Sequence, residues 1–184
     1  NILYQEESIS EIRQKPKHQQ PIISKLIGKT KRKDCYKWVN EQIIKSGKQE
    51  QAFVIMPLVE ETESLLRSVV SETKALQETH FRDLNIAAIH GRLKDAEKQE
   101  IMKKFAKKEI NVLIATTVVE VGMDFPDATM MIIENAERYG LAQLHQLRGR
   151  VGRGEKKSHC FVIPGDDVEA DSNAAKRLKY FVKH

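Results

Sequence analysis

The sequence predicts an α/β fold in which a mostly parallel sheet is covered by helices on both faces. Short apolar segments rich in β-branched residues alternate along the chain with longer segments whose apolar residues recur at helical spacing. The chain has 184 residues, of which 40% are hydrophobic and 31% charged, enough for one globular domain with one core. No run is long and apolar enough for a membrane span, so we expect no membrane partner.

The expected strands are short runs dominated by Ile, Val, Leu and Ala, as is typical of strands buried on both faces. The first follows Pro21, and the second ends at Pro57, since proline cannot donate to a ladder of hydrogen bonds. In order, they are expected over 22–27, 52–56, 86–89, 111–115, 128–133 and 159–163.

A helix is expected after every strand except the strand over 111–115, which is followed by the strand over 128–133 with no helix between them. Gly47 ends the first helix, and Asp95 is expected to be the N-cap of the third. They are expected over 33–45, 61–78 and 95–108, from 141, and from about 171. Their buried residues are expected to be Tyr36, Val39, Ile43, Leu65, Leu66, Val69, Val70, Leu76, Ile101, Met102, Phe105, Ala106, Leu141, Leu144, Leu147, Ala174, Leu178, Phe181 and Val182.

Charge and cysteine content narrow the class of protein. The net charge is +5 and the pI about 9.1, and nine lysines and arginines between Arg13 and Lys37 face only Asp34. This stretch is equally consistent with a nucleic-acid contact and with a solvated connector. Cys35 and Cys160 are far apart in sequence, which favours reduced thiols and a cytoplasmic location. The histidines lack the spacing of metal ligands, so no metal site is expected.

The segment 143–154, QLHQLRGRVGRG, sets three arginines and three glycines behind a helical turn. Leucines at helical spacing give that turn a face to dock, and the glycines then break the helix. Guanidinium groups held on a tight turn are planar, always charged donors with little rotamer freedom left to lose. We therefore interpret Arg148, Arg150 and Arg153 as a polyphosphate site in preference to a basic surface loop.

A second polar segment, 115–124, reads ATTVVEVGMD and follows the expected strand over 111–115. Ligands in open α/β sheets bind beyond the carboxyl ends of strands, so we expect its polar residues there. Hydroxyls of Thr116 and Thr117 can bond phosphate or ribose, Gly122 permits close backbone approach, and Asp124 can accept from a ribose hydroxyl. Alone, this is ordinary loop chemistry; beside the arginine turn it indicates a nucleotide or nucleic-acid site.

The two segments, ATT…GMD followed by QLRGRVGR, resemble motifs V and VI of superfamily 2 helicases. The flanking text, including AAIHGRLKDAEKQEIMKKF and IIENAERYGLAQLHQLRGRVGRGEKKSHCFVI, closely resembles the RecG family of bacterial ATP-dependent DNA helicases. The transcription-repair coupling factors share GLAQLHQLRGRVGR but are less similar at EVGMD and HGRLK. The resemblance implies a RecA-like three-layer sandwich, the second motor domain of a superfamily 2 helicase.

The resemblance also implies an activity and partners. It implies an ATP-dependent helicase or translocase that remodels branched double-stranded DNA, such as stalled forks and Holliday junctions, in recombination and repair. The partners would be that DNA and the first motor domain of the same chain, in a monomer in the bacterial cytoplasm. Residues 1–20 would connect to that domain, 21–165 would form the helicase C-terminal domain, and 166–184 would begin a C-terminal translocation region.

The resemblance carries roles onto matching residues. Arg150 and Arg153 would be catalytic. The nucleotide would contact Gly122, Asp124, Gln146, Arg150 and Arg153, and the DNA would contact His90, Gly91, Arg92, Thr116 and Thr117. For His145 and Trp38 we expect packing or hydrogen bonding within the fold. Arg148, two residues before Arg150, is either part of the phosphate site or structural, and for His90 a polar strand end is as reasonable as a DNA contact.

The sequence contains no complete P-loop, because Ile23 stands where G-x-x-x-x-G-K-[ST] requires glycine ahead of Gly28-Lys29-Thr30. No acidic box on a strand is apparent either. We therefore expect ATP with Mg²⁺ to be held mainly by the first motor domain, and these 184 residues alone to be inactive. The alternatives are a translocase lobe of a transcription-repair coupling factor and a non-catalytic nucleic-acid-binding RecA-like domain.

Overall fold

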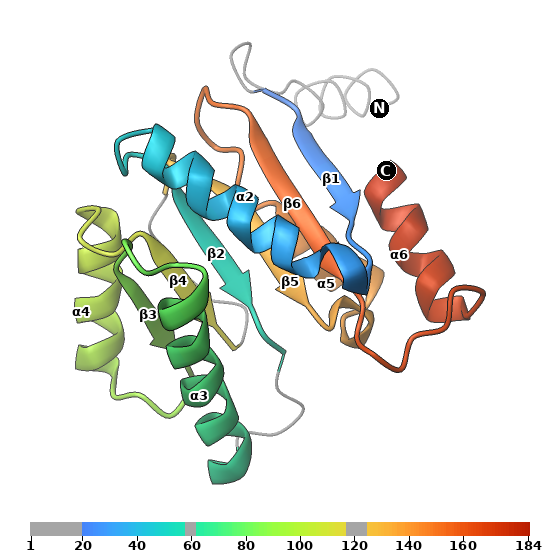
Figure 1. Ribbon diagram of the computed structural model, residues 1–184, viewed down its shortest axis with the longest axis horizontal. Coiled ribbons are helices and arrows are strands. Elements are labelled where there is room, and N and C mark those ends of the chain that lie inside the picture. Colours follow the sequence, from blue (N-terminus) through green and yellow to red (C-terminus); the bar gives the residue numbers. More distant parts are fainter. Residues whose placement is uncertain (1–19, 58–61, 117–124) are drawn as a thin grey trace, which may run out of the picture.

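The computed structural model describes residues 20–57, 62–116 and 125–184, which form a single parallel sheet covered by helices (Figure 1). The sheet has six strands in the order β1-β6-β5-β2-β4-β3, and every neighbouring pair is parallel. The strands are β1 (Ile22–Leu26), β2 (Gln51–Ile55), β3 (Ile86–Ile89), β4 (Val112–Ala115), β5 (Ala128–Glu134) and β6 (Ser158–Ile163). This arrangement confirms the expected three-layer α/β fold.

The helices cross back over the two faces of the sheet. They are α2 (Arg32–Lys45), α3 (Glu63–Thr79), α4 (Asp95–Ala106), α5 (Leu141–Arg148) and α6 (Asn173–Lys183), with short 3₁₀ turns at Lys29–Lys31 and Ala136–Arg138. In Figure 1, α2 and α3 lie in front of the sheet. Buried residues of α4, α5 and α6 belong to one apolar cluster and those of α2 and α3 to another. Each face of the sheet is thus covered by its own set of helices.

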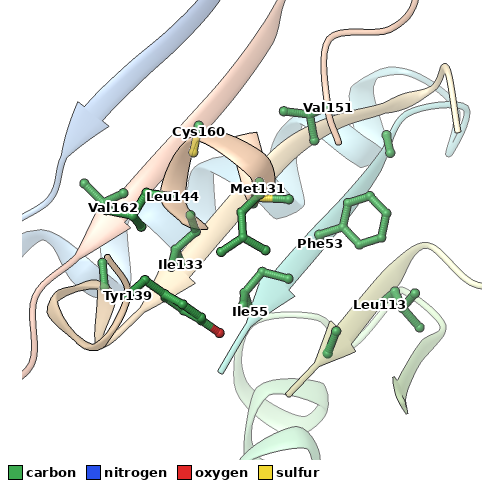
Figure 2. Close-up of a cluster of buried hydrophobic side chains, with 14 of the residues drawn as sticks. Phe53, Ile55, Leu113, Met131, Ile133, Tyr139, Leu144, Val151, Cys160 and Val162 are labelled. Carbon is green, nitrogen blue, oxygen red and sulfur yellow. The ribbon is translucent and has the colours of Figure 1, made fainter. Parts of the chain in front are cut away.

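Successive side chains of each strand point to opposite faces of the sheet and so belong alternately to the two apolar clusters. In β4, Leu113 and Ala115 face the α4–α5–α6 side, while Val112 and Ile114 face the α2–α3 side. All four are fully buried, which explains why the strand is a continuous apolar run and not an alternating one. The Phe53, Phe105 and Phe125 rings contact one another in the first cluster, with centroids 5.0 to 6.1 Å apart. Figure 2 shows Phe53 among the neighbours that close this core.

Three expectations about the helices were wrong. Lys94, and not Asp95, is the N-cap of α4, and its backbone N–H donates to Glu97 at 3.1 Å. Val70 is 58% exposed, because the buried stripe of α3 runs through Val69 and Leu76 and the next position turns away. Ala106 is exposed for the same reason, next to the fully buried Phe105.

Because every strand points the same way, the sheet has two distinct edges that the site depends on. At the edge we call the carboxyl edge, β2, β3, β4, β5 and β6 end at Ile55, Ile89, Ala115, Glu134 and Ile163. At the opposite edge, the amino edge, β1, β5 and β6 begin at Ile22, Ala128 and Ser158. Among the described helices, none is long and apolar enough to cross a membrane.

Candidate nucleotide and nucleic-acid site

The arginine turn, residues 149–154, is built from buried anchors that alternate with arginines. Leu144 and Leu147 fix α5 in the core, and Gly149 caps the helix with its N–H donating to His145 O and Leu147 O. Val151 is 1% exposed, so the turn dips back into the core between Arg150 and Arg153. Gly152 has φ +76°, a conformation that favours glycine. The turn is therefore held by its apolar and glycine positions, without help from the Arg150 side chain.

The turn lies at the amino edge of the sheet. A Cβ on Gly152 would lie 2.7 Å from Ile22 Cγ1 at the start of β1, with Ser158 at the start of β6 also nearby. A Cβ on Gly154 would lie 2.6 Å from Pro126 O, just before β5. These two glycines thus let the turn press directly against the strand starts.

The three arginines have different surroundings. Arg148 donates to Ser24 Oγ at 3.1 Å and Phe181 O at 3.2 Å, contacts His145 Nδ1 at 2.7 Å, and lies 4.3 Å from the Phe181 ring centroid. Arg153 is exposed, with Nε donating to Gly149 O at 3.2 Å. The half-buried Arg150 makes no side-chain hydrogen bond or ion pair within the described part of the chain. Arg148 is therefore used by the fold, which decides between the two roles considered for it, and the Arg150 side chain is available for a ligand.

The expected DNA-contact residues gather at the opposite, carboxyl edge. Thr116 and His90 follow the neighbouring strands β4 and β3, and Thr116 N donates to Ile89 O at 3.3 Å. Thr116 Oγ1 and His90 Nδ1 are buried and have no hydrogen-bond partner among residues 20–57, 62–116 and 125–184. Gly91 and Arg92 are exposed beside them, and Gly91 O accepts from Lys98 Nζ at 3.2 Å. Buried polar atoms of this kind normally have a partner, so this edge is suited to a polar ligand.

The structure thus separates residues that the sequence interpretation grouped together. Thr116 is at the carboxyl edge, as expected, but the chain is at the amino edge by Phe125–Ala128, beside the arginine turn. Thr117, Gly122 and Asp124 lie outside the described residues. Gln146 is exposed on α5. Of the expected nucleotide-binding residues, the structure therefore places Gln146, Arg150 and Arg153 on one continuous segment.

The structure also contains a polar cleft of about 560 Å³ at the carboxyl edge, which the sequence analysis did not predict. The buried Glu134, at the end of β5, accepts from Arg32 Nε at 2.8 Å and Tyr36 Oη at 2.7 Å. A second carboxylate, Glu72, pairs with the same guanidinium at 3.1 Å. Burial, followed by the charge of Glu134, raises the pKa of the Tyr36 phenol well above its ordinary value, so it remains a donor. The available signal was a carboxylate closing the apolar run ATMMIIE, which needs a buried partner.

Two further expectations about packing are confirmed. His145 contacts Arg148 and packs edge-on against Phe181, with ring centroids 5.1 Å apart. Burial, together with the charge of Arg148, lowers the pKa of His145. Trp38 packs edge-on against His159 and Phe161, with centroids at 4.8 and 5.5 Å. Both residues are therefore used by the fold.

Comparisons with known proteins identify the family of this chain. The family described as "Helicase conserved C-terminal domain" matches residues 34–155. The ATP-dependent DNA helicase RecG of Aquifex aeolicus (strain VF5) is 40% identical over 182 residues, which are 98% of this chain and 22% of that protein. The RecG protein of Escherichia coli (strain K12) is 43% identical over 160 residues, 87% of this chain and 23% of that one. The chain thus spans less than a quarter of the length of these relatives.

Solved structures agree. The structure titled "Structure of RecG bound to three-way DNA junction" has a TM-score of 0.75 and 37% identity, covering 92% of this chain and 21% of that one. Mss116p DEAD-box helicase domain 2 bound to an RNA duplex has a TM-score of 0.62 at 21% identity, covering 78% of this chain and 54% of that one. The second similarity concerns the fold alone. Together these findings confirm the resemblance that the motifs indicated.

Proposed function

The chain belongs to the family of helicase conserved C-terminal domains, and on this premise we propose that it is the second motor lobe of a RecG-type, ATP-dependent DNA helicase or translocase. The complete protein would remodel branched double-stranded DNA in recombination and repair, as a monomer in the bacterial cytoplasm. Residues 1–20 would lead in from the first motor domain, 21–165 would form this lobe, and 166–184 would begin the translocation region. The similarity to RecG proteins favours this proposal over a coupling factor.

The observation that carries the proposal is the arginine turn. Its backbone is anchored by Val151 and by Gly152 and Gly154, while the Arg150 side chain makes no hydrogen bond or ion pair in the described part of the chain. A guanidinium that the fold does not use, on a turn that the fold holds, fits a polyphosphate approached from the other lobe. ATP with Mg²⁺, bound mainly by the first motor domain, would supply the phosphoanhydride that is hydrolysed.

Arg150 and Arg153 would act on charge that develops during phosphoryl transfer. An arginine supplied across an interface stabilises that charge without contributing much to ground-state affinity. Gln146, one turn earlier on α5, would orient the nucleotide by hydrogen bonding, with Gly122 and Asp124 contacting it from the loop before β5. The lobe would therefore complete a catalytic site that neither lobe forms alone.

DNA would bind at the carboxyl edge. Thr116 and His90 bring buried polar atoms without a partner in the described residues to neighbouring strand ends, and Gly91 and Arg92 are exposed next to His90. Thr117 would add a further hydroxyl contact to the DNA. A motor that moves without regard to sequence must hold phosphates and not base edges. Placing DNA and nucleotide at opposite edges allows the sheet between them to move as one rigid body.

The test uses the complete protein, with each arginine replaced in turn. Arg150→Ala and Arg153→Ala should each lower DNA-stimulated ATP turnover by about 10³-fold, the usual effect of losing such an arginine. Binding of nucleotide and DNA should change little, and lysine should restore little activity, because a point charge on a flexible stem cannot replace a planar fork. Phosphate release, nucleotide titration and thermal unfolding measure the three effects.

Arg67→Ala is the matched control, since Arg67 is an exposed arginine on α3 that is not among the residues expected to contact nucleotide or DNA. It should leave turnover unchanged. If Arg150→Ala and Arg153→Ala unfold the domain while the folded fraction keeps its specific activity, both arginines are structural and the proposal fails.

A further inference from the structure

Two segments meet at the amino edge in a contact that we call the seam. One is the turn before β5, residues 125–128, and the other is the end of the arginine turn with the residues after it, 154–156. Ala128 N donates to Phe125 O at 3.0 Å, which closes a four-residue turn with Pro126 at its second position. Gly154 packs on this turn so closely that a Cβ would lie 2.6 Å from Pro126 O. Arg153 is therefore one residue away from a backbone-to-backbone contact.

Asp127 holds this seam from both sides. Its Oδ2 lies 2.8 Å from Lys108 Nζ, beyond the end of α4, and its Oδ1 lies 3.2 Å from Lys156 Nζ. Its backbone oxygen accepts from Gln51 N at 2.8 Å, at the start of β2. One residue thus connects α4, β2, the turn before β5 and the exit of the arginine turn.

The two ion pairs of Asp127 are partly shielded from solvent. The Asp127 and Lys108 side chains are each 28% exposed. The hydrogen bond from Lys108 lowers the pKa of Asp127; burial opposes this shift, and Lys156 adds to it. Asp127 thus keeps its charge at every pH above the ordinary aspartate range. An aspartate that served only solubility would not need ion pairs with Lys108 and Lys156 and a hydrogen bond from the buried Gln51.

We propose that Asp127 is a positioning residue for Arg153: by clamping Lys156 and the 125–128 turn together, it fixes the height of Arg153 above the amino edge. The inference rests on the proposed function, since it concerns the geometry of an arginine aimed at the phosphates. Displacing a catalytic group by about 1 Å can cost about 10²-fold in rate. The seam constrains the position of Arg153, which adjoins it, more than that of Arg150, because the buried Val151 lies between Arg150 and the seam.

The test is Asp127→Asn in the complete protein, a substitution that keeps shape and removes charge. DNA-stimulated kcat should fall about tenfold, while the KM for ATP and the affinity for DNA stay within about twofold. In an Arg153→Ala background the same substitution should cost nothing further, because the residue it positions is gone. In an Arg150→Ala background the two losses should multiply. Asp127→Glu should recover part of the activity.

Asp34→Asn is the control, because Asp34 forms an exposed ion pair with Lys31 at 3.8 Å, far along the chain from the seam. It should leave kcat unchanged in every background. Gly154→Ala disturbs the same seam without altering charge, and it should lower kcat and lose its effect when Arg153 is absent.

Amide hydrogen exchange separates this inference from the proposed function. Asp127→Asn should accelerate exchange of residues 150–156 and leave β2 protected. If Arg153→Ala does not affect turnover, the proposed function fails at that residue, and exchange alone decides whether Asp127 holds the turn. Unchanged exchange at 150–156, or a loss of kcat that multiplies with that of Arg153→Ala, overturns the positioning role.

Discussion

At the residue scale, chemically identical side chains have different roles because of a few neighbouring atoms. Arg148 and Arg150 are two positions apart, yet the Arg148 side chain contacts Ser24, His145 and Phe181, whereas the Arg150 side chain makes no hydrogen bond or ion pair within the described residues. The difference arises because α5 still sets the direction of Arg148, while Arg150 follows the glycine that ends the helix. Arginines in a motif can therefore be assigned roles only when their contacts are known.

Glu134 shows the same principle in the cleft. Removing its carboxylate leaves a fully buried Tyr36 hydroxyl without its acceptor and a partly buried Arg32 with one fewer partner. Glu134→Ala should therefore lower the free energy of unfolding by about 2–4 kcal/mol. Glu72→Ala removes a 42% exposed carboxylate from the same arginine and should cost less than about 1 kcal/mol.

Urea unfolding of both variants measures the difference. Equal losses would mean that the buried network contributes no more than a surface ion pair, contrary to this argument.

At the element scale, α5 connects the parts of the lobe. It starts at Leu141, after the carboxyl end of β5, and it ends where the arginine turn begins at the amino edge. Along the way Arg148 ties it to β1 and to the last turn of α6, which lies beside β1 in Figure 1. A displacement of the arginine turn would therefore also displace α6, through the contacts of Arg148.

Arg148→Met should loosen α6 without unfolding the sheet. It removes the hydrogen bonds to Ser24 Oγ and Phe181 O and the contact with the Phe181 ring, together worth about 1–2 kcal/mol. Amide exchange should accelerate in α6 and remain unchanged in α2. Arg67→Met on the exposed face of α3 serves as the control, with a change within about 0.5 kcal/mol. Protection of α6 identical to the parent would show that its apolar stripe alone holds it.

At the scale of the whole molecule, the parallel sheet keeps two kinds of chemistry apart. The arginine turn lies where β1, β5 and β6 begin, and Thr116 and His90 lie where β4 and β3 end. A strand of four to seven residues separates the two edges by about 13–23 Å. DNA and nucleotide should therefore respond to different substitutions.

Thr116→Val with His90→Gln should weaken DNA binding by the complete protein while nucleotide affinity changes little. Arg150→Ala should leave DNA affinity nearly unchanged. Because phosphates are the target, affinity should fall steeply with salt and be nearly independent of base sequence. Fluorescence anisotropy on branched DNA at several salt concentrations measures this. A strong sequence preference, or a DNA defect in Arg150→Ala, would contradict the division between edges.

The sequence by itself determined the order and type of the elements, and it pointed to the arginine turn. Helical and strand periodicity are local properties, so the strands and helices were predicted with bounds that differ by one or two residues for most elements. The motifs also identified the family, because they are contiguous in sequence.

Only the tertiary structure decided what depends on distant segments. The side on which Val70 lies, the carboxylate network of Glu134, and the clamp of Asp127 between Lys108 and Lys156 all join residues from separate elements. The placement of Thr116 and the arginine turn at opposite edges likewise follows from strand order and direction, which local periodicity does not encode. Burial and charge pairing are set by which segments the sheet brings together, and that is a property of the folded chain.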